Sequence, residues 1–258
     1  MQISEIAADN LAKDGKVLGK QWFQTYGGWF SDRENMQTFI NSVTGSRLLP
    51  HHSLEILYLG SASGILGEEL LRTLRQGHLT LVDVSQQHLD LNTNPATTKL
   101  CLDVLGMNLG KKYDVVMMRS FLDYFPSRTD QVAVLRTVGN HLKPGGLFIN
   151  QPAFIPDVNT RDLISRAYCS VPSIGKRLFQ SYDLCDLYAQ ADFNPPLKYG
   201  EGKRMRITEE DHIARYDISG SDVETIQSIV KDAKPSAEVT EHGYILEFEF
   251  PIFINPHW

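Results

Sequence analysis

Cysteine is scarce in this chain, and its few copies are poorly spaced for disulfide or metal chemistry. The 258 residues include three cysteines, Cys101, Cys169 and Cys185, and no two of them form a C-x-x-C pair. This spacing gives neither a disulfide framework nor a structural zinc site. A chain without paired cysteines fits a reducing compartment, so we predict a cytoplasmic protein.

Long apolar runs and an excess of positive charge are also missing. No stretch approaches the roughly 18 apolar residues of a membrane helix, and the acidic, polar start of the chain lacks a signal-peptide pattern. The 25 lysines and arginines are outnumbered by 31 aspartates and glutamates, which gives a net charge of -6. Because phosphate neutralisation needs clustered cations, neither a nucleic acid nor a membrane is a predicted partner.

Several common site motifs are absent as well. No G-K-[ST] follows a glycine-rich turn, which excludes a P-loop. No H-E-x-x-H is present, and the pair His51-His52 is typical of a polar loop, so no metal is predicted. The segment GSASG has alanine where a G-x-S-x-G nucleophile elbow needs serine.

What the sequence does contain is short apolar runs that alternate with amphipathic segments. Strands are predicted over 55–59, 78–82, 99–102, 113–118 and 146–150, and helices over 64–76, 86–91 and 130–142. This alternation predicts parallel βαβ units with helices on both faces of the sheet.

The second half of the chain gives a weaker pattern. Helices are predicted over 157–168, 182–191 and 222–232, the last with Ser221 as a cap. A late strand is predicted over 244–254, where Pro251 indicates an edge or a bulge. The sixth strand has two candidates, 196–199 and 238–241.

The most informative segment is LYLGSASG at 57–64, where a predicted strand runs into small residues and then into a helix. Gly60 and Gly64 permit a tight turn and a close approach of the backbone to a ligand. The helix N-terminus behind the turn offers free N–H groups. The alternative is a strand-to-helix turn that binds nothing.

Two acidic residues follow the next two strands. Asp83, 19 residues after Gly64, ends the second strand, where a carboxylate can accept hydrogen bonds from both ribose hydroxyls of a nucleoside. Its alternative role is to cap the helix that starts near Ser85. Asp103 follows the third strand and is placed either to accept from an adenine amine, beside a backbone donor at Val104, or to face solvent in a loop.

Taken in order, these features resemble the core of a class I S-adenosylmethionine-dependent methyltransferase over residues 54–150. The remaining pieces of the resemblance are YDVVMMRSFLDYF at 113–125 and LKPGG at 142–146. The resemblance implies a Rossmann-like, doubly wound, mostly parallel seven-stranded sheet. It divides the chain into an N-terminal helical lid, 1–53, and a methyltransferase domain, 54–258, with a helical insertion at about 151–235.

The resemblance also implies S-adenosyl-L-methionine as cofactor, S-adenosyl-L-homocysteine as product, and a set of contacts. The turn would hold the methionine portion, Asp83 the ribose and Asp103 the adenine. Two departures from the family pattern stand out: Tyr58 replaces an acidic residue, and Ala62 replaces the middle glycine. The implied cofactor-binding residues are Gly60, Ser61, Ala62, Gly64, Asp83, Val84, Asp103, Val104, Arg119 and Ser120.

Weaker sequence signals indicate which residues bind the methyl acceptor. Aromatic residues are predicted to line an acceptor pocket, with Gly27-Gly28 as the hinge of the lid; the alternative is that they pack the N-terminal helices onto the sheet. Asp123 or Tyr124 is predicted to orient or deprotonate the methyl acceptor. The alternative is that these two residues lie at the surface or serve packing. The predicted acceptor-binding residues are Trp22, Tyr26, Trp29 and Phe121.

The sequence therefore predicts an enzyme that methylates an O, N or C atom of a small-molecule acceptor, with a homodimer as its assembly. One alternative is a protein that binds the cofactor without methyl transfer, as a regulatory module or a cyclase, because no general base is evident. Another is an NAD(P)-dependent oxidoreductase, since 62–67 approximates G-x-G-x-x-G. Its Tyr-x-x-x-Lys pair, Tyr199 and Lys203, contains two glycines that disfavour the required helix. The cationic run at 198–206 is interpreted as a solvated loop, or else as a contact for an anionic acceptor.

Overall fold

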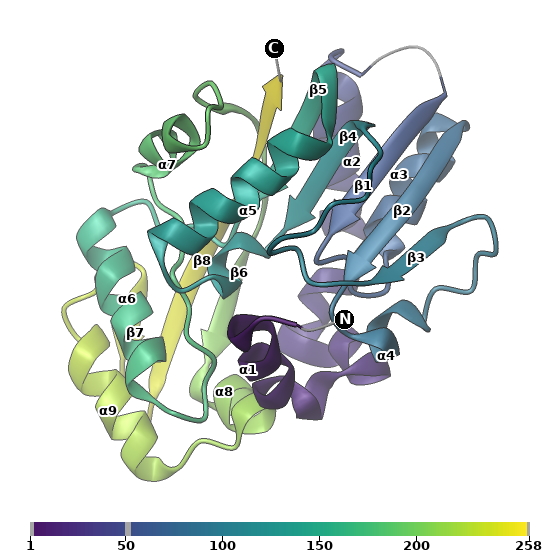
Figure 1. Ribbon diagram of the computed structural model, residues 1–258. Coiled ribbons are helices and arrows are strands. Elements are labelled where there is room, and N and C mark those ends of the chain that lie inside the picture. The colour runs from purple at the N-terminus through teal and green to yellow at the C-terminus, as the bar shows by residue number, and fades with distance from the viewer. Residues whose placement is uncertain (1–2, 50–52, 257–258) are drawn as a thin grey trace.

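The computed structural model describes residues 3–49 and 53–256, which form one sheet and its flanking helices (Figure 1). The strands are β1 (Leu54–Leu59), β2 (Gly77–Asp83), β3 (Thr98–Cys101), β4 (Tyr113–Arg119), β5 (Leu142–Gln151), β6 (Leu197–Thr208), β7 (Ala237–Val239) and β8 (Tyr244–Pro256). The helices are α1 (Glu5–Lys13), α2 (Arg33–Gly45), α3 (Ile65–Leu74), α4 (Gln86–Leu89), α5 (Arg128–His141), α6 (Val158–Ser170), α7 (Leu184–Gln190), α8 (Glu209–Tyr216) and α9 (Gly220–Val230), with 3₁₀-helices η1 (Gly15–Val17), η2 (Gly19–Ser31) and η3 (Leu122–Tyr124).

The sheet has the order β3-β2-β1-β4-β5-β8-β6, and β7 pairs with β8 outside this path. Strands β1 to β5 are parallel, whereas β8 runs antiparallel to both of its neighbours. This arrangement confirms the predicted mostly parallel, Rossmann-like sheet. The carboxyl ends of β1, β2 and β4 therefore meet at one edge, where ligands bind in open α/β sheets.

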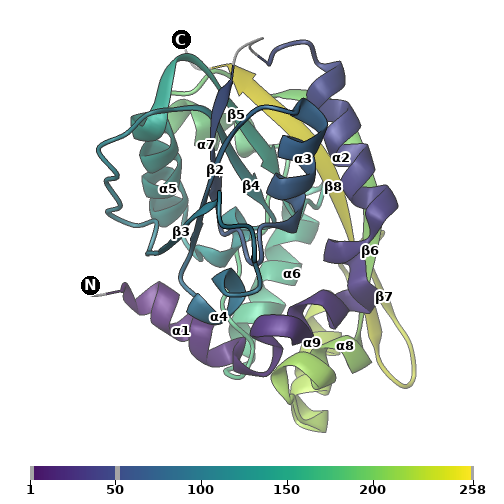
Figure 2. The same ribbon diagram turned by 90° about the vertical axis from the view of Figure 1, so that its right-hand side faces the viewer.

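Helices cover both faces of the sheet, with α5 on one side and α2 and α3 on the other (Figure 2). Strand β4 is buried at every position, which explains the apolar run VVMM at its centre, residues 115–118. The core on the α3 side includes Phe39, Leu70 and Leu81, and the core on the α5 side includes Leu135 and Phe148. Both cores hold the strand ends in fixed positions.

The sixth strand lies where the sequence looked like a loop. Strand β6 begins near the candidate 196–199 but continues through the cationic run to Thr208, so the predicted insertion contains a strand of the main sheet. Its two glycines are packing sites: a Cβ at Gly200 would lie 2.1 Å from Ser42 Oγ, and one at Gly202 would lie 2.6 Å from Gln151 Nε2. The strand accepts glycine there because α2 and Gln151 approach it closely.

The structure decides two smaller predictions. Pro251 follows the bulge alternative and not the edge alternative: β8 lies between β5 and β6, and its pairing with β6 shifts register on both sides of the residue pair Glu201 and Pro251. The cap of α9 is Ser219 rather than Ser221, and Ser219 forms a reciprocal capping box with Asp222. Within the described residues, no helix is both long and apolar enough to span a bilayer.

A buried histidine in α8 makes the stability of the fold sensitive to acid. The ring of His212 lies 2.8 Å from the Tyr168 hydroxyl and 2.6 Å from the Tyr244 hydroxyl. Burial, helped by the nearby Arg215, lowers the pKa of His212 to about 3. In the unfolded chain this histidine has a pKa of about 6.5, so it takes up a proton at a higher pH than it does in the folded chain. The free energy of unfolding therefore decreases as the pH falls below about 6.5.

We expect this residue alone to reduce the free energy of unfolding by about 2 kcal/mol between pH 7 and pH 5. Urea unfolding at the two pH values should show that increment in the wild type. His212→Gln should be less stable than the wild type at pH 7, but its free energy of unfolding should lack this change between the two pH values. Parallel pH profiles for the two proteins would contradict the assignment.

Candidate functional site

A cleft lies at the carboxyl ends of β1, β2 and β4, and residues of α1, including Ala7 and Asn10, line one side of it. Its space, including the open mouth, is about 1090 Å³. The sequence-predicted residues that line it are Trp22, Gly60, Ser61, Ala62, Asp83, Val84, Asp103, Val104, Arg119, Ser120, Phe121 and Tyr124.

The turn after β1 is built from left-handed backbone. Gly60 has φ +60°, and a Cβ there would lie 2.1 Å from the Phe121 ring. Gly64 has φ +74° and packs against Leu81, so it serves the contact between α3 and β2 and does not line the cleft. Ala62 also has a positive φ, of 47°. The two glycines are thus explained by close packing of side chains against the turn.

Asp83 connects this turn to the end of β2. Its Oδ2 accepts from the Ala62 amide and its Oδ1 from the Ser85 amide, both at 2.8 Å. Ser85, rather than Asp83, caps α4 by accepting from the His88 amide. Since each carboxylate oxygen has two acceptor directions, Asp83 retains capacity to accept further hydrogen bonds on its cleft side.

Asp103 ties the N-terminal segment to the end of β3. Its Oδ2 accepts from the Ser4 amide at 2.8 Å, and its Oδ1 accepts from the Leu105 amide at 3.0 Å. Asp103 is buried rather than solvated, and Val104 beside it is 2% exposed. The contact with Ser4 was not predicted, because the chain start carries no pattern that indicates its partner.

Arg119, at the end of β4, is a cation with incomplete hydrogen bonding. Its Nε donates to Gln151 Oε1 and its Nη1 to the Phe30 carbonyl, each at 3.0 Å, and the guanidinium lies over the Trp29 ring at 4.6 Å. Burial lowers the pKa of Arg119 to about 10, so it stays charged at neutral pH. Its Nη2 is buried and has no partner among the described residues.

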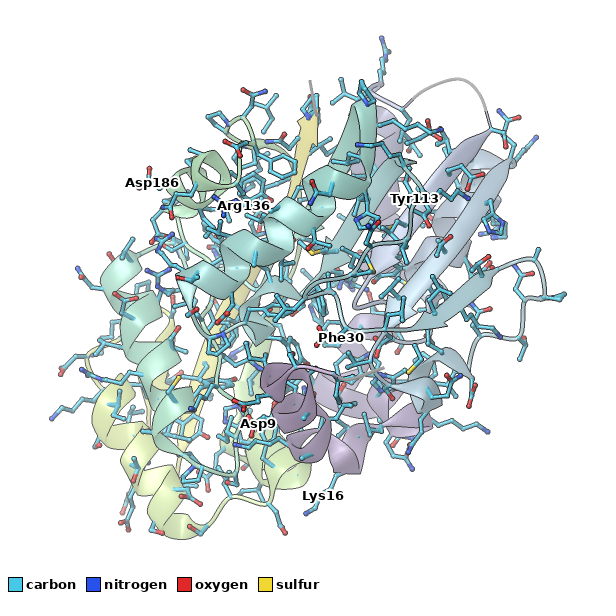
Figure 3. All side chains as sticks on the ribbon, in the orientation of Figure 1. Asp9, Lys16, Phe30, Tyr113, Arg136 and Asp186 are labelled. Carbon is cyan, nitrogen blue, oxygen red and sulfur yellow. The ribbon has the colours of Figure 1, made fainter. Side chains whose placement is uncertain are left out.

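A second, smaller cavity adjoins the first. Its space is about 360 Å³, and Phe30, Ser120 and Tyr124 line both cavities. Figure 3 shows Phe30 between the N-terminal helices and the strand ends, whereas Asp9 and Lys16 lie on the outer side of that segment. The boundary between the cavities is therefore only a few side chains thick.

The predicted acceptor and catalytic residues divide between these two spaces. Tyr26 and Asp123 line only the second cavity, and Tyr124 lines both. Trp29 lines neither, because its ring is buried against Phe250, 4.0 Å away, and its Nε1 donates to the Lys203 carbonyl. Trp29 therefore follows the packing alternative. The backbone of η2 does kink at residues 25–28, which include the predicted hinge.

A buried group of charges beside the second cavity was not predicted. Arg215 donates to Asp14 Oδ1 at 2.7 Å and to the hydroxyls of Tyr26 and Tyr124. Arg177 lies over the Tyr124 ring at 3.4 Å. Asp14 and Arg215 are 201 residues apart in sequence, so no local pattern indicates their pairing.

Among the described residues, no group of three or more histidine, cysteine, aspartate or glutamate side chains is arranged to hold a metal ion. His51-His52 lies outside the described residues.

The mostly parallel sheet, the glycine turn after β1 and the cleft at the strand ends define a Rossmann-like α/β domain. Residues 57–148 match a family model described as a methyltransferase domain. Over these residues the chain is similar to methyltransferase domains, and no subfamily is distinguished. No curated protein matches the sequence.

Solved structures share this fold at low sequence identity. A methyltransferase described as putative from Bacillus halodurans has a TM-score of 0.62 and 13% identity, over 86% of this chain and 99% of that one. The N-methyltransferase NodS from Bradyrhizobium japonicum, solved with S-adenosylhomocysteine, has a TM-score of 0.54 and 13% identity, over 98% of this chain and 100% of that one. Magnesium protoporphyrin IX methyltransferase from Synechocystis, with bound S-adenosylmethionine, has a TM-score of 0.55 and 11% identity, over 97% of each chain.

Proposed function

We propose that this chain binds S-adenosylmethionine in the cleft and transfers its methyl group to an O, N or C atom of a small-molecule acceptor. One observation carries the proposal: the cleft holds a carboxylate at Asp83 and a buried cation at Arg119, whose Nη2 has no partner among the described residues. A zwitterionic nucleoside with a sugar and an amino-acid tail needs this pair of groups. The cofactor supplies a methyl group activated on a sulfonium sulfur.

The remaining predicted contacts follow from this orientation. Asp83 would accept from the ribose hydroxyls, and Asp103 and Val104 would meet the adenine at the β3 side of the cleft. Ser61 and Ala62 would lie along the methionine portion. The unpartnered Nη2 of Arg119 supports a contact with the methionine carboxylate, because a buried cation is stabilised by an anion that it can hydrogen-bond.

Tyr58, which stands where the family usually has an acidic residue, lines the same cleft. Burial raises the pKa of Tyr58 to about 12, so it is a neutral hydroxyl at physiological pH. We propose that recognition of the amino-acid tail has moved from an acid on β1 toward Arg119 on β4, which would bind the carboxylate rather than the amino group.

The ribose assignment is tested by isothermal titration of S-adenosylhomocysteine into Asp83→Asn. A hydrogen bond to a charged group is worth roughly 1.5–3 kcal/mol, so affinity should fall about tenfold to a hundredfold. Asp90→Asn, an exposed aspartate on the neighbouring α4 cap, is the matched control and should bind as the wild type does. Equal affinity in wild type and Asp83→Asn would contradict the assignment.

Transfer itself is measured as S-adenosylhomocysteine formation from S-adenosylmethionine across a panel of small acceptors. Binding without product in every case would instead support the cofactor-binding module. Hydride-linked absorbance change with a nicotinamide cofactor would support the oxidoreductase.

A further inference from the structure

We propose that the second cavity is the acceptor site, and that it takes a single-ring aromatic molecule whose hydroxyl or amine donates a hydrogen bond to Asp123. This inference rests on the proposed function, because it requires the methyl group to lie on the cleft side of Ser120. It adds a location, a substrate class and a proton acceptor.

The position of the second cavity suits a transfer between two bound molecules. Phe30, Ser120 and Tyr124 line both spaces, and Ser120 follows directly on Arg119, the last residue of β4. A ligand in the cleft and a ligand in the second cavity would therefore meet at this shared wall. An acceptor that approached from the exposed mouth of the cleft would not use the cavity at all.

The walls of the second cavity indicate the shape of its occupant. Its space, including the part open to solvent, is about 360 Å³, a third of that of the cleft. Aromatic rings dominate the lining, and such surfaces favour flat apolar bodies. Besides Tyr124, the aromatic residues are Tyr26, Phe30, Tyr168, Phe179, Tyr216 and Phe248.

Asp123 provides the polar recognition. Its side chain lines the second cavity, the residue is 4% exposed, and its Oδ1 is buried with no hydrogen-bond partner among the described residues. Its backbone is fixed, since its carbonyl accepts from the Leu178 amide at 3.0 Å. An unmatched buried acceptor on a fixed backbone calls for a donor from a ligand.

The neighbouring cations are already engaged, which argues against an anionic acceptor. Arg215 donates to Asp14, Tyr26 and Tyr124, and Arg177 donates to Asn10 Oδ1 at 3.0 Å. The group without a partner at this cavity is therefore a hydrogen-bond acceptor, so the molecule that occupies the cavity must offer a hydrogen-bond donor. Burial raises the pKa of Asp123, although Arg177 and Arg215 oppose this shift, and a raised pKa makes the carboxylate a better proton acceptor.

The transfer step balances with the groups named. A lone pair on the acceptor oxygen or nitrogen forms the new bond to the methyl carbon. The electron pair of the carbon–sulfur bond returns to sulfur, which leaves the neutral thioether of S-adenosylhomocysteine. The proton of the attacking atom passes to the Asp123 carboxylate, so one positive and one negative charge disappear together.

The test is calorimetric binding of phenol and of anisole, which lacks the donor, to protein saturated with S-adenosylhomocysteine. Phenol should bind the wild type roughly ten- to a hundredfold more tightly than anisole. Asp123→Leu should bind S-adenosylhomocysteine normally but should no longer distinguish the two rings. Asp186→Leu, at an exposed aspartate of α7, is the matched control and should retain the preference.

Equal binding of phenol and anisole to the wild type would overturn the proposal, even if Asp123→Leu did not fold. So would a preference for phenol that survives in Asp123→Leu, or competition between phenol and S-adenosylhomocysteine. The proposed function fails separately, if the wild type does not bind S-adenosylhomocysteine.

Discussion

Asp14→Ala is expected to lower the free energy of unfolding by about 3–5 kcal/mol, the cost of removing one partner of a buried ion pair. Asp14 and Arg215 are 6% and 4% exposed, and two guanidinium nitrogens donate to Asp14 Oδ1. Without Asp14, Arg215 would stay buried, and the hydrogen-bond partners left to it would be the hydroxyls of Tyr26 and Tyr124. In a chain of this size, the melting temperature should fall on the order of 10 °C.

Asp9→Ala is the matched control for this effect. Asp9 lies in α1, the helix that ends directly before Asp14, and pairs with Lys13 at the surface, where the Asp9 side chain is 46% exposed. Exposed pairs contribute little, so its urea unfolding curve should nearly overlay that of the wild type. Equal losses in the two variants would show that the Asp14–Arg215 pair does not hold the N-terminal segment in place.

Arg119→Met is expected to weaken S-adenosylhomocysteine binding by more than about 30-fold, since loss of one member of a buried charge pair costs roughly 2–5 kcal/mol of affinity. Methionine fills much of the same space among Trp29 and Phe30 but cannot bind a carboxylate. Isothermal titration gives the affinity, and thermal melting checks that the variant folds.

The ligand 5′-methylthioadenosine, which lacks the amino-acid tail, separates this effect from general damage to the cleft. Arg119→Met should bind it as the wild type does, whereas Asp83→Asn should bind both ligands weakly. If Arg119→Met loses affinity for the two ligands equally, Arg119 supports the shape of the cleft and does not contact the carboxylate.

The central sheet was predictable because its strands are continuous apolar runs. Strands β1, β2, β4 and β5 lie within a few residues of their predicted bounds, since a strand covered on both faces needs apolar side chains throughout. Strand β6 escaped prediction because it is rich in lysine, arginine and glycine. In its second half only Gly202, Met205 and Ile207 are buried. Lysine and arginine residues stand between them, so the sequence shows no clear alternation of apolar and polar residues.

The residues of the candidate site could likewise be predicted only in part. Residues at the carboxyl ends of strands, such as Asp83 and Arg119, can be located from sequence because the topology places strand ends together. The partners that define their surroundings come from distant segments, and no local pattern reveals them. Ser4 reaches Asp103 across 99 residues, and Phe30 reaches Arg119 across 89. The second cavity is formed by such distant contacts, so only part of its lining, including Tyr26, Asp123 and Tyr124, was predicted.

The most direct test of this account is a crystal structure of the protein with S-adenosylhomocysteine. We predict one ligand per chain in the cleft, with its ribose hydroxyls on Asp83 and its carboxylate on Arg119 Nη2. A ligand bound elsewhere, or one that leaves both of these side chains without contact, would contradict the account.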